Sequence, residues 1–84
     1  MINTINKMMD IVRANTGASE VYIDMLLSLL PNSSHKVNIN EWNYRADYDS
    51  KNMVLKIMTN QSNIWEFEKL IIPYREEIKK YLKK

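Results

Sequence analysis

The sequence has no cysteine, one glycine, two prolines and one histidine among its 84 residues. The lack of cysteine excludes a disulfide framework, a thiolate nucleophile and a cysteine-type zinc site, and it fits a reducing compartment. A single glycine is too few for a glycine-rich phosphate loop. The longest apolar run is about half of the roughly 20 residues that a membrane helix needs, and the N-terminus has no signal-peptide pattern. We therefore expect a soluble, cytoplasmic protein.

Patterns typical of catalysis or metal binding are also scarce. Ser33 and Ser34 precede the only histidine, His35, but neighbouring loop residues do not face one another as a catalytic triad requires. Residues 47–58 begin like a calcium loop, yet Asn52 stands where the loop needs glycine and Met58 where it needs glutamate. We expect no catalytic residue, no metal and no cofactor, and we predict that the protein is not an enzyme.

What the sequence does contain is typical of one folded domain spanning residues 1–84. It is 45% hydrophobic and 26% charged, which is a globular rather than a disordered composition. Its most apolar stretch is residues 21–30, and read as a helix this stretch has one polar stripe, in which the preceding Glu20, Asp24 and Ser28 are spaced four residues apart. A helix with one narrow polar stripe is buried on most sides. We expect this helix to lie at the centre of the fold.

Helices are predicted on both sides of this element. An apolar stripe at i, i+3, i+4 and i+7 predicts a helix over roughly residues 3–15, and it comprises Ile5, Met8, Met9 and Val12. Gly17 is expected at its C-terminus, Thr16 or Ser19 at the next N-cap, and Pro31 at the end of the second helix. From Asn63 the helical period returns, with a capping box at Asn63 and Glu66. Pro73 is expected either to kink this helix or to begin a new one at its first turn.

Between these helices the period changes to two. Apolar residues alternate with polar ones through Trp42, Tyr44, Ala46 and Tyr48, which indicates a strand. Residues 49–52 have a turn composition, and pairing Tyr48 with Met53 gives a hairpin with one apolar face. The predicted class is α+β, with a helical hairpin, an antiparallel β-hairpin and a Pro-kinked C-terminal helix. The alternative is an all-α bundle in which a helix capped at Asp49 runs to Thr59.

The outer face of the predicted hairpin is the first candidate site. It places Val54 and Met58 beside Arg45 and Lys56, so that two apolar groups share a mixed surface next to open strand edges. Such a face suits a partner protein or a second copy of the chain. We predict that Arg45, Val54, Lys56 and Met58 bind protein.

The second candidate site is the basic C-terminus. Residues 75–84 carry five basic and two acidic groups, and the lysines are Lys79, Lys80, Lys83 and Lys84. Lysines of this kind make phosphate contacts that do not depend on nucleic-acid sequence. Nucleic-acid binding through these four residues is therefore the alternative function.

Together these patterns favour a small interaction or regulatory protein that binds another protein's surface, with a homodimer as one form. Abundant Asn, Lys and Ile with few Ala and Gly suggest an AT-rich genome. Small size and absent catalytic motifs are common among bacterial and phage accessory proteins, inhibitors included. We expect no membrane partner.

Overall fold

The computed structural model describes residues 1–31 and 33–82, and in these ranges the chain is helical without any strand. The elements are α1 (Ile2–Ala14), α2 (Gly17–Ser28), α3 (Ile39–Arg45), α4 (Tyr48–Thr59), α5 (Gln61–Ile71), the 3-10 turn η1 (Ile72–Tyr74) and α6 (Arg75–Leu82). The α+β prediction is therefore wrong, and the all-α alternative fits.

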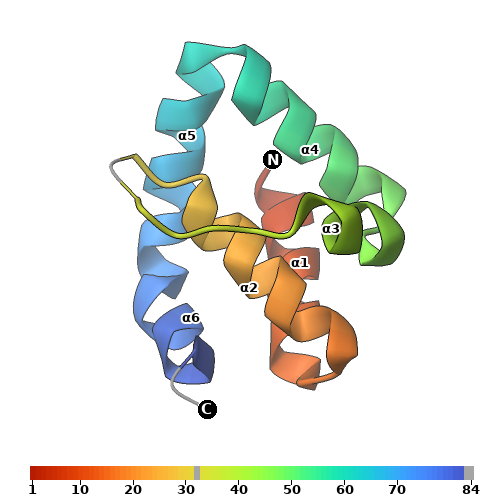
Figure 1. The fold of residues 1–84 in the computed structure, drawn as a ribbon. Coiled ribbons are helices and arrows are strands. Elements are labelled where there is room, and N and C mark those ends of the chain that lie inside the picture. Colours follow the sequence, from red (N-terminus) through yellow and green to blue (C-terminus); the bar gives the residue numbers. More distant parts are fainter. Residues whose placement is uncertain (32, 83–84) are drawn as a thin grey trace.

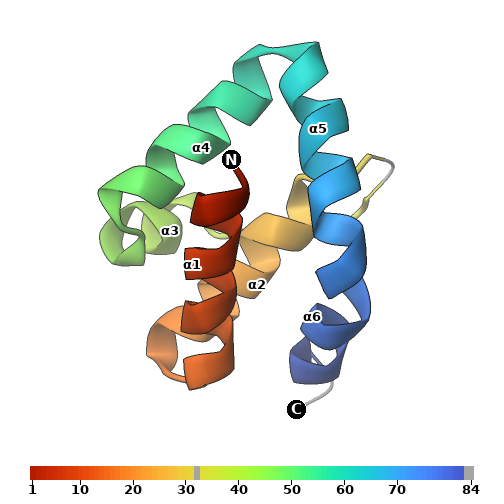
Figure 2. The same cartoon turned by 180° about the vertical axis from the view of Figure 1, so that it is seen from behind.

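The helix α2 runs through the middle of the molecule, as predicted. α1 covers it on one side, residues 33–38 cross it in extended form on the other, and α3 and α6 also pack against it (Figures 1 and 2). Six of its apolar residues are buried: Val21, Tyr22, Ile23, Met25, Leu26 and Leu27. Glu20 is exposed, while Asp24 and Ser28 are partly buried, so the predicted polar stripe is present.

The first helix is also confirmed, and its buried residues are the four of the predicted stripe. The turn that follows differs from the prediction. Asn15, rather than Gly17, adopts the left-handed conformation, with φ 54°, as asparagine often does after a helix. Thr16 is the N-cap of α2, its backbone N–H donates to Ser19 Oγ at 2.8 Å, and Gly17 is the first helical residue.

The predicted β-hairpin is replaced by α3 and α4. The four alternating residues do not share a face, because Trp42 is 3% exposed whereas Tyr44 is 85% and Tyr48 is 77% exposed. Side-chain caps begin both helices: Asn38 accepts a hydrogen bond from the Glu41 N–H, and Asp47 caps α4. The buried positions of α4 then follow the helical period at Ser50, Met53, Val54 and Ile57.

The C-terminal half forms α5, η1 and α6. The helix α5 is capped by Asn60, not by the predicted box at Asn63, and it buries Phe67 and Ile71. Pro73 lies in the 3-10 turn that separates α5 from α6, so the chain interrupts its helix there and starts a new one. The helices α4 and α5 form a bent pair that packs against α1, and the chain then continues through η1 into α6 (Figures 1 and 2).

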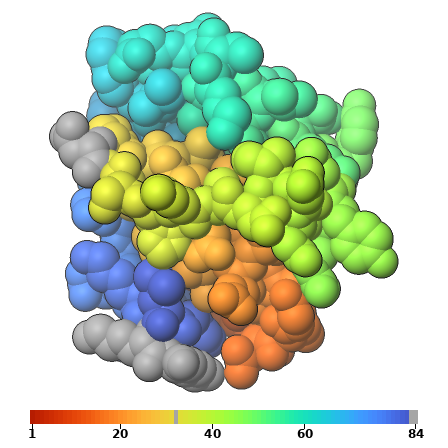
Figure 3. Space-filling model, viewed as in Figure 1, coloured from red at the N-terminus to blue at the C-terminus, as the bar shows by residue number. Residues whose placement is uncertain are grey.

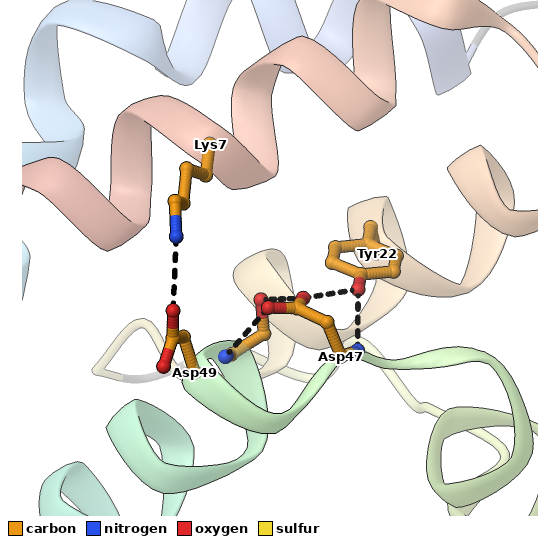
Figure 4. A network of polar contacts seen from close by, with 5 residues as sticks. Lys7, Tyr22, Asp47 and Asp49 are labelled. Atoms are coloured by element: carbon orange, nitrogen blue, oxygen red, sulfur yellow. Dashed lines mark hydrogen bonds and ion pairs between the residues drawn. The ribbon is translucent and has the colours of Figure 1, made fainter.

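A partly buried polar network joins α2 to the start of α4 (Figure 4). Tyr22 Oη donates to Asp47 Oδ1 at 2.7 Å and accepts from the Asp47 N–H at 3.0 Å, while the Ser50 hydroxyl donates to the same carboxylate. Burial by itself raises the pKa of Asp47, but the hydrogen bonds from Ser50 and Tyr22 outweigh it and hold that pKa below its ordinary value. Burial raises the pKa of Tyr22.

Candidate functional site

The helix α4 has two flanks that face different surroundings. Lys51, Val54, Leu55 and Met58 are spaced at i, i+3, i+4 and i+7 and line a groove against α3. Asp49, Asn52, Met53 and Lys56 have the same spacing on the other flank, where they line a polar depression shared with α1 and α5. Only the first flank is apolar, and it forms the candidate site.

We call this site the α3–α4 groove, and its volume is about 210 Å³. Its lining residues are Met25 from α2, Ile39, Trp42 and Asn43 from α3, and Lys51, Val54, Leu55 and Met58 from α4. Met25, Trp42 and Val54 are buried, whereas Ile39, Leu55 and Met58 are 50%, 59% and 54% exposed. The groove therefore has a buried apolar floor and apolar rims open to solvent. The two helices lie side by side on the face shown in Figure 3.

Tyr22 of α2 contacts both walls of the groove. Its ring packs edge-on against Trp42, with centroids 5.1 Å apart and planes at 64°, which is a favourable aromatic geometry. Its hydroxyl holds Asp47, the N-cap of α4. One side chain of α2 thus contacts the floor residue of α3 and the first residue before α4, so that both walls are positioned by the core.

Among the residues that the structure describes, Lys51 is the only charged one that lines the groove. No ion pair within 4.0 Å involves Lys51 among the described residues, so its ammonium is available to a ligand. Two other charged side chains of this region already form ion pairs. Arg45 pairs with Glu41 at 2.8 Å, and Asp49 pairs with Lys7 at 2.9 Å. The groove therefore combines an apolar surface with one free positive charge.

The structure separates the residues predicted to bind protein. Val54 and Met58 line the same groove. Lys56 lies on the opposite flank of α4, and Arg45 lines a third depression together with residues of α2. The four residues do not form one surface, because a helix turns residues 56 and 58 to opposite sides whereas a strand would place them together.

Six groove residues were missed as site residues: Met25, Ile39, Trp42, Asn43, Lys51 and Leu55. The hairpin interpretation placed Trp42 and Leu55 on its inner face, away from Val54 and Met58. The helical spacing of residues 51, 54, 55 and 58 could have found Lys51 and Leu55. The other four belong to α2 and α3 and share no such spacing with α4.

The basic C-terminus is only partly described. Lys79 lines a depression between α6 and residues 33–36, and Lys80 is exposed elsewhere on α6. Lys83 and Lys84, also predicted to bind nucleic acid, lie outside the described residues. Within the described part, Lys79 is therefore grouped with Arg75 and Lys36 rather than with a run of lysines.

The imidazole ring of His35 contacts the carboxylate of Asp24 rather than a serine hydroxyl. Its Nε2 lies 2.7 Å from Asp24 Oδ1, and its backbone N–H donates to Ser33 Oγ at 3.1 Å. Across residues 1–31 and 33–82, no group of three or more His, Asp or Glu side chains is placed to hold a metal ion. None of the helices described there has the length and apolar character needed to cross a membrane.

Comparison with known proteins gives no relative: no protein-family model, no curated protein and no solved structure matches the chain.

Proposed function

We propose that this protein is a non-enzymatic binding protein that holds an amphipathic helix of a partner protein in the α3–α4 groove. The observation that carries the proposal is the presence of Ile39, Leu55 and Met58, all half exposed, around one apolar floor. Large apolar side chains are costly to leave in water, and a contiguous set of them marks an interaction site more often than single ones do.

The size of the groove favours side chains of a protein over a separate small molecule. Its volume of about 210 Å³ lies below the roughly 300–1,000 Å³ of most small-molecule pockets. An amphipathic helix presents apolar anchors at i, i+3 or i+4 and i+7, which enter a groove of this kind a few at a time. The exposed Met58 adds an adaptable surface for such anchors.

The charge of the groove specifies the partner further. Lys51 is its only charged residue and has no acid partner among the described residues. A partner helix that carries Asp or Glu beside its apolar stripe complements this ammonium, whereas a basic helix is repelled. We therefore propose an acidic amphipathic helix as the ligand. We place this interaction in the cytoplasm, consistent with a cysteine-free sequence.

A peptide selection tests the chemistry of this ligand without knowledge of the partner. A displayed library with apolar residues at helical spacing and random flanks is selected on the wild-type protein and counter-selected on L55E/M58E. We expect peptides enriched in Asp and Glu that bind the wild type at least 10-fold more tightly than L55E/M58E.

The matched control is W65E, because Trp65 on α5 is as exposed as Leu55, at 59% each, but does not line the groove. We expect the selected peptides to bind W65E like the wild type. Peptides that bind L55E/M58E equally well, or that are enriched in Lys and Arg, would contradict the proposal. Light scattering of the free protein tests whether a second copy of the chain occupies the groove instead. A dimer that L55E/M58E breaks and W65E does not would assign the groove to that second copy.

A further inference from the structure

A second hollow, separate from the α3–α4 groove, lies between α6 and residues 33–36. We call it the basic depression, and its volume is about 560 Å³. It is lined by Leu27 and Leu30 of α2, Pro31, Ser33, Ser34, His35 and Lys36 of the connecting segment, and Arg75, Lys79 and Leu82 of α6. We infer that this depression binds the phosphate group of a small phosphomonoester. The inference is independent of the function proposed for the groove.

The positive charge of the depression comes from two elements that are distant in sequence. Lys36 lies on the segment that crosses α2, and Arg75 and Lys79 are one helical turn apart on α6. In the space-filling view this segment runs across the same face as α6 (Figure 3). Cations that converge on a concave surface focus a positive potential there.

These cations are poorly matched by acids of the protein itself. No acidic residue lines the depression, and no ion pair within 4.0 Å involves Lys36 or Arg75 among the described residues. Lys79 has one contact, at 4.0 Å, with the highly exposed Glu76. A second carboxylate, Asp24, contacts a lining residue and is held against the His35 ring at 2.7 Å. Lys36 and Arg75 thus remain for a ligand, together with Lys79, whose contact with Glu76 lies at the 4.0 Å limit of an ion pair.

The donors suit a phosphate better than a carboxylate. A guanidinium offers a planar fork of N–H groups for two oxygens, and each ammonium offers three donors. Ser33 and Ser34 add hydroxyls, and Ser33 Oγ already accepts the His35 N–H, so that its own proton is free to be donated. A phosphomonoester presents three acceptor oxygens and about −1.5 to −2 charges, which use more of these donors than the two oxygens of a carboxylate.

The apolar floor indicates what carries the phosphate. Leu27, Leu30, Pro31 and Leu82 line the depression beside the cations, and its volume is within the range of about 300–1,000 Å³ typical of small-molecule sites. No aromatic side chain lines it, whereas single-stranded nucleic acid is usually held by stacking of its bases on aromatic rings. A small molecule with one phosphate and an apolar body therefore fits better than a nucleic-acid strand.

The test is an NMR titration of the full chain with phenyl phosphate, and with inorganic phosphate as the same anion without an apolar body. We expect saturable amide shifts in residues 33–36 and 75–79, with phenyl phosphate binding at least fivefold more tightly than inorganic phosphate. The variants R75Q/K79Q and K36Q should each weaken the binding of phenyl phosphate, and R75Q/K79Q should weaken it by at least 10-fold. The control K69Q/K80Q removes the same charge from lysines outside the depression and should change binding by less than twofold.

Three results would overturn the inference. One is the absence of saturable shifts at these residues, and another is equal weakening by R75Q/K79Q and K69Q/K80Q, which indicates general charge attraction. The third is a single-stranded oligonucleotide that binds the depression while phenyl phosphate does not, which would assign it to nucleic acid. Thermal unfolding followed by circular dichroism controls for folding, and all variants should melt like the wild type because the altered side chains are exposed.

Discussion

At the scale of single residues, Asp47 has the most connected role in the structure. It caps α4, accepts the Tyr22 hydroxyl and the Ser50 hydroxyl, and donates its own N–H to Tyr22. Asp47 itself is exposed at the surface while Tyr22 and Ser50 are buried. The residue therefore links the central helix to the wall of the groove.

Removing the Asp47 side chain should destabilise the fold. D47A loses the N-cap of α4 and leaves the Tyr22 hydroxyl without its acceptor, and we expect the free energy of unfolding to fall by about 1–2 kcal/mol. Urea unfolding at pH 7 measures this loss. D47N keeps a good N-cap residue and should cost less than D47A, whereas equal losses in the two variants would show that capping contributes nothing.

The same carboxylate predicts how stability depends on pH. Because hydrogen bonding lowers the pKa of Asp47 in the folded protein, its stabilisation is complete above the unfolded value of about 3.9 and is lost as pH falls through the folded pKa. Glu77 acts in the same direction, because its hydrogen bonds to Arg13 lower its pKa. Urea unfolding measured between pH 5 and pH 2 should show that the free energy of unfolding falls less steeply with decreasing pH in D47N than in the wild type. Parallel pH profiles would contradict this assignment.

At the scale of elements, the outer helices could be predicted from sequence and the middle could not. The stripe Ile5, Met8, Met9 and Val12 matches a helical period alone, and Pro73 can only break or kink a helix. Residues 42–48 alternate by chance, since Trp42 belongs to α3 and Tyr48 begins α4. Asp47 was read as an outward strand residue, although an Asp three residues before Ser50 is also a normal helix start. The Tyr22 contact that fixes it spans 25 residues and leaves no local signal.

Alanine substitutions distinguish the two interpretations of this segment. In a hairpin, one buried face would contain Trp42, Tyr44 and Tyr48. Alanine substitution of each would then lower the free energy of unfolding by a similar amount. In the helical structure W42A should cost about 3–5 kcal/mol, while Y44A and Y48A should each change the free energy of unfolding by less than about 0.5 kcal/mol. Denaturant titration of the three variants measures the difference. A large loss in Y44A or Y48A would contradict the helical assignment.

Only part of the candidate site could be predicted from the sequence. The sequence predicts Val54 and Met58 as exposed apolar residues, and the structure places both at the α3–α4 groove. Met58 is exposed there, whereas Val54 is buried in the floor. Their predicted companions Arg45 and Lys56 were chosen on strand geometry, and they lie elsewhere. A site made by two helices requires knowledge of how the helices pack, and residue spacing alone does not provide it.

At the scale of the whole molecule, stability depends on one helix enclosed by the others. A domain of 84 residues has only about 4–12 kcal/mol of net stability, and Leu26 in α2 is fully buried. L26A should therefore cost about 2–5 kcal/mol, a large share of the total, and should lower the urea midpoint without a change in the slope. Loss of less than about 1 kcal/mol would show that α2 is not the centre of the core.

The proposed binding role also belongs to this scale, because it uses a surface that three helices build together. The most direct measurement is photo-crosslinking in the source cells, with benzoylphenylalanine placed at position 58 in the groove or at position 65 on α5. We predict a crosslinked protein at position 58 that is absent at position 65, with the attachment point in an acidic amphipathic helix. Identical crosslinks at both positions, or attachment to a basic or non-helical segment, would contradict the proposal.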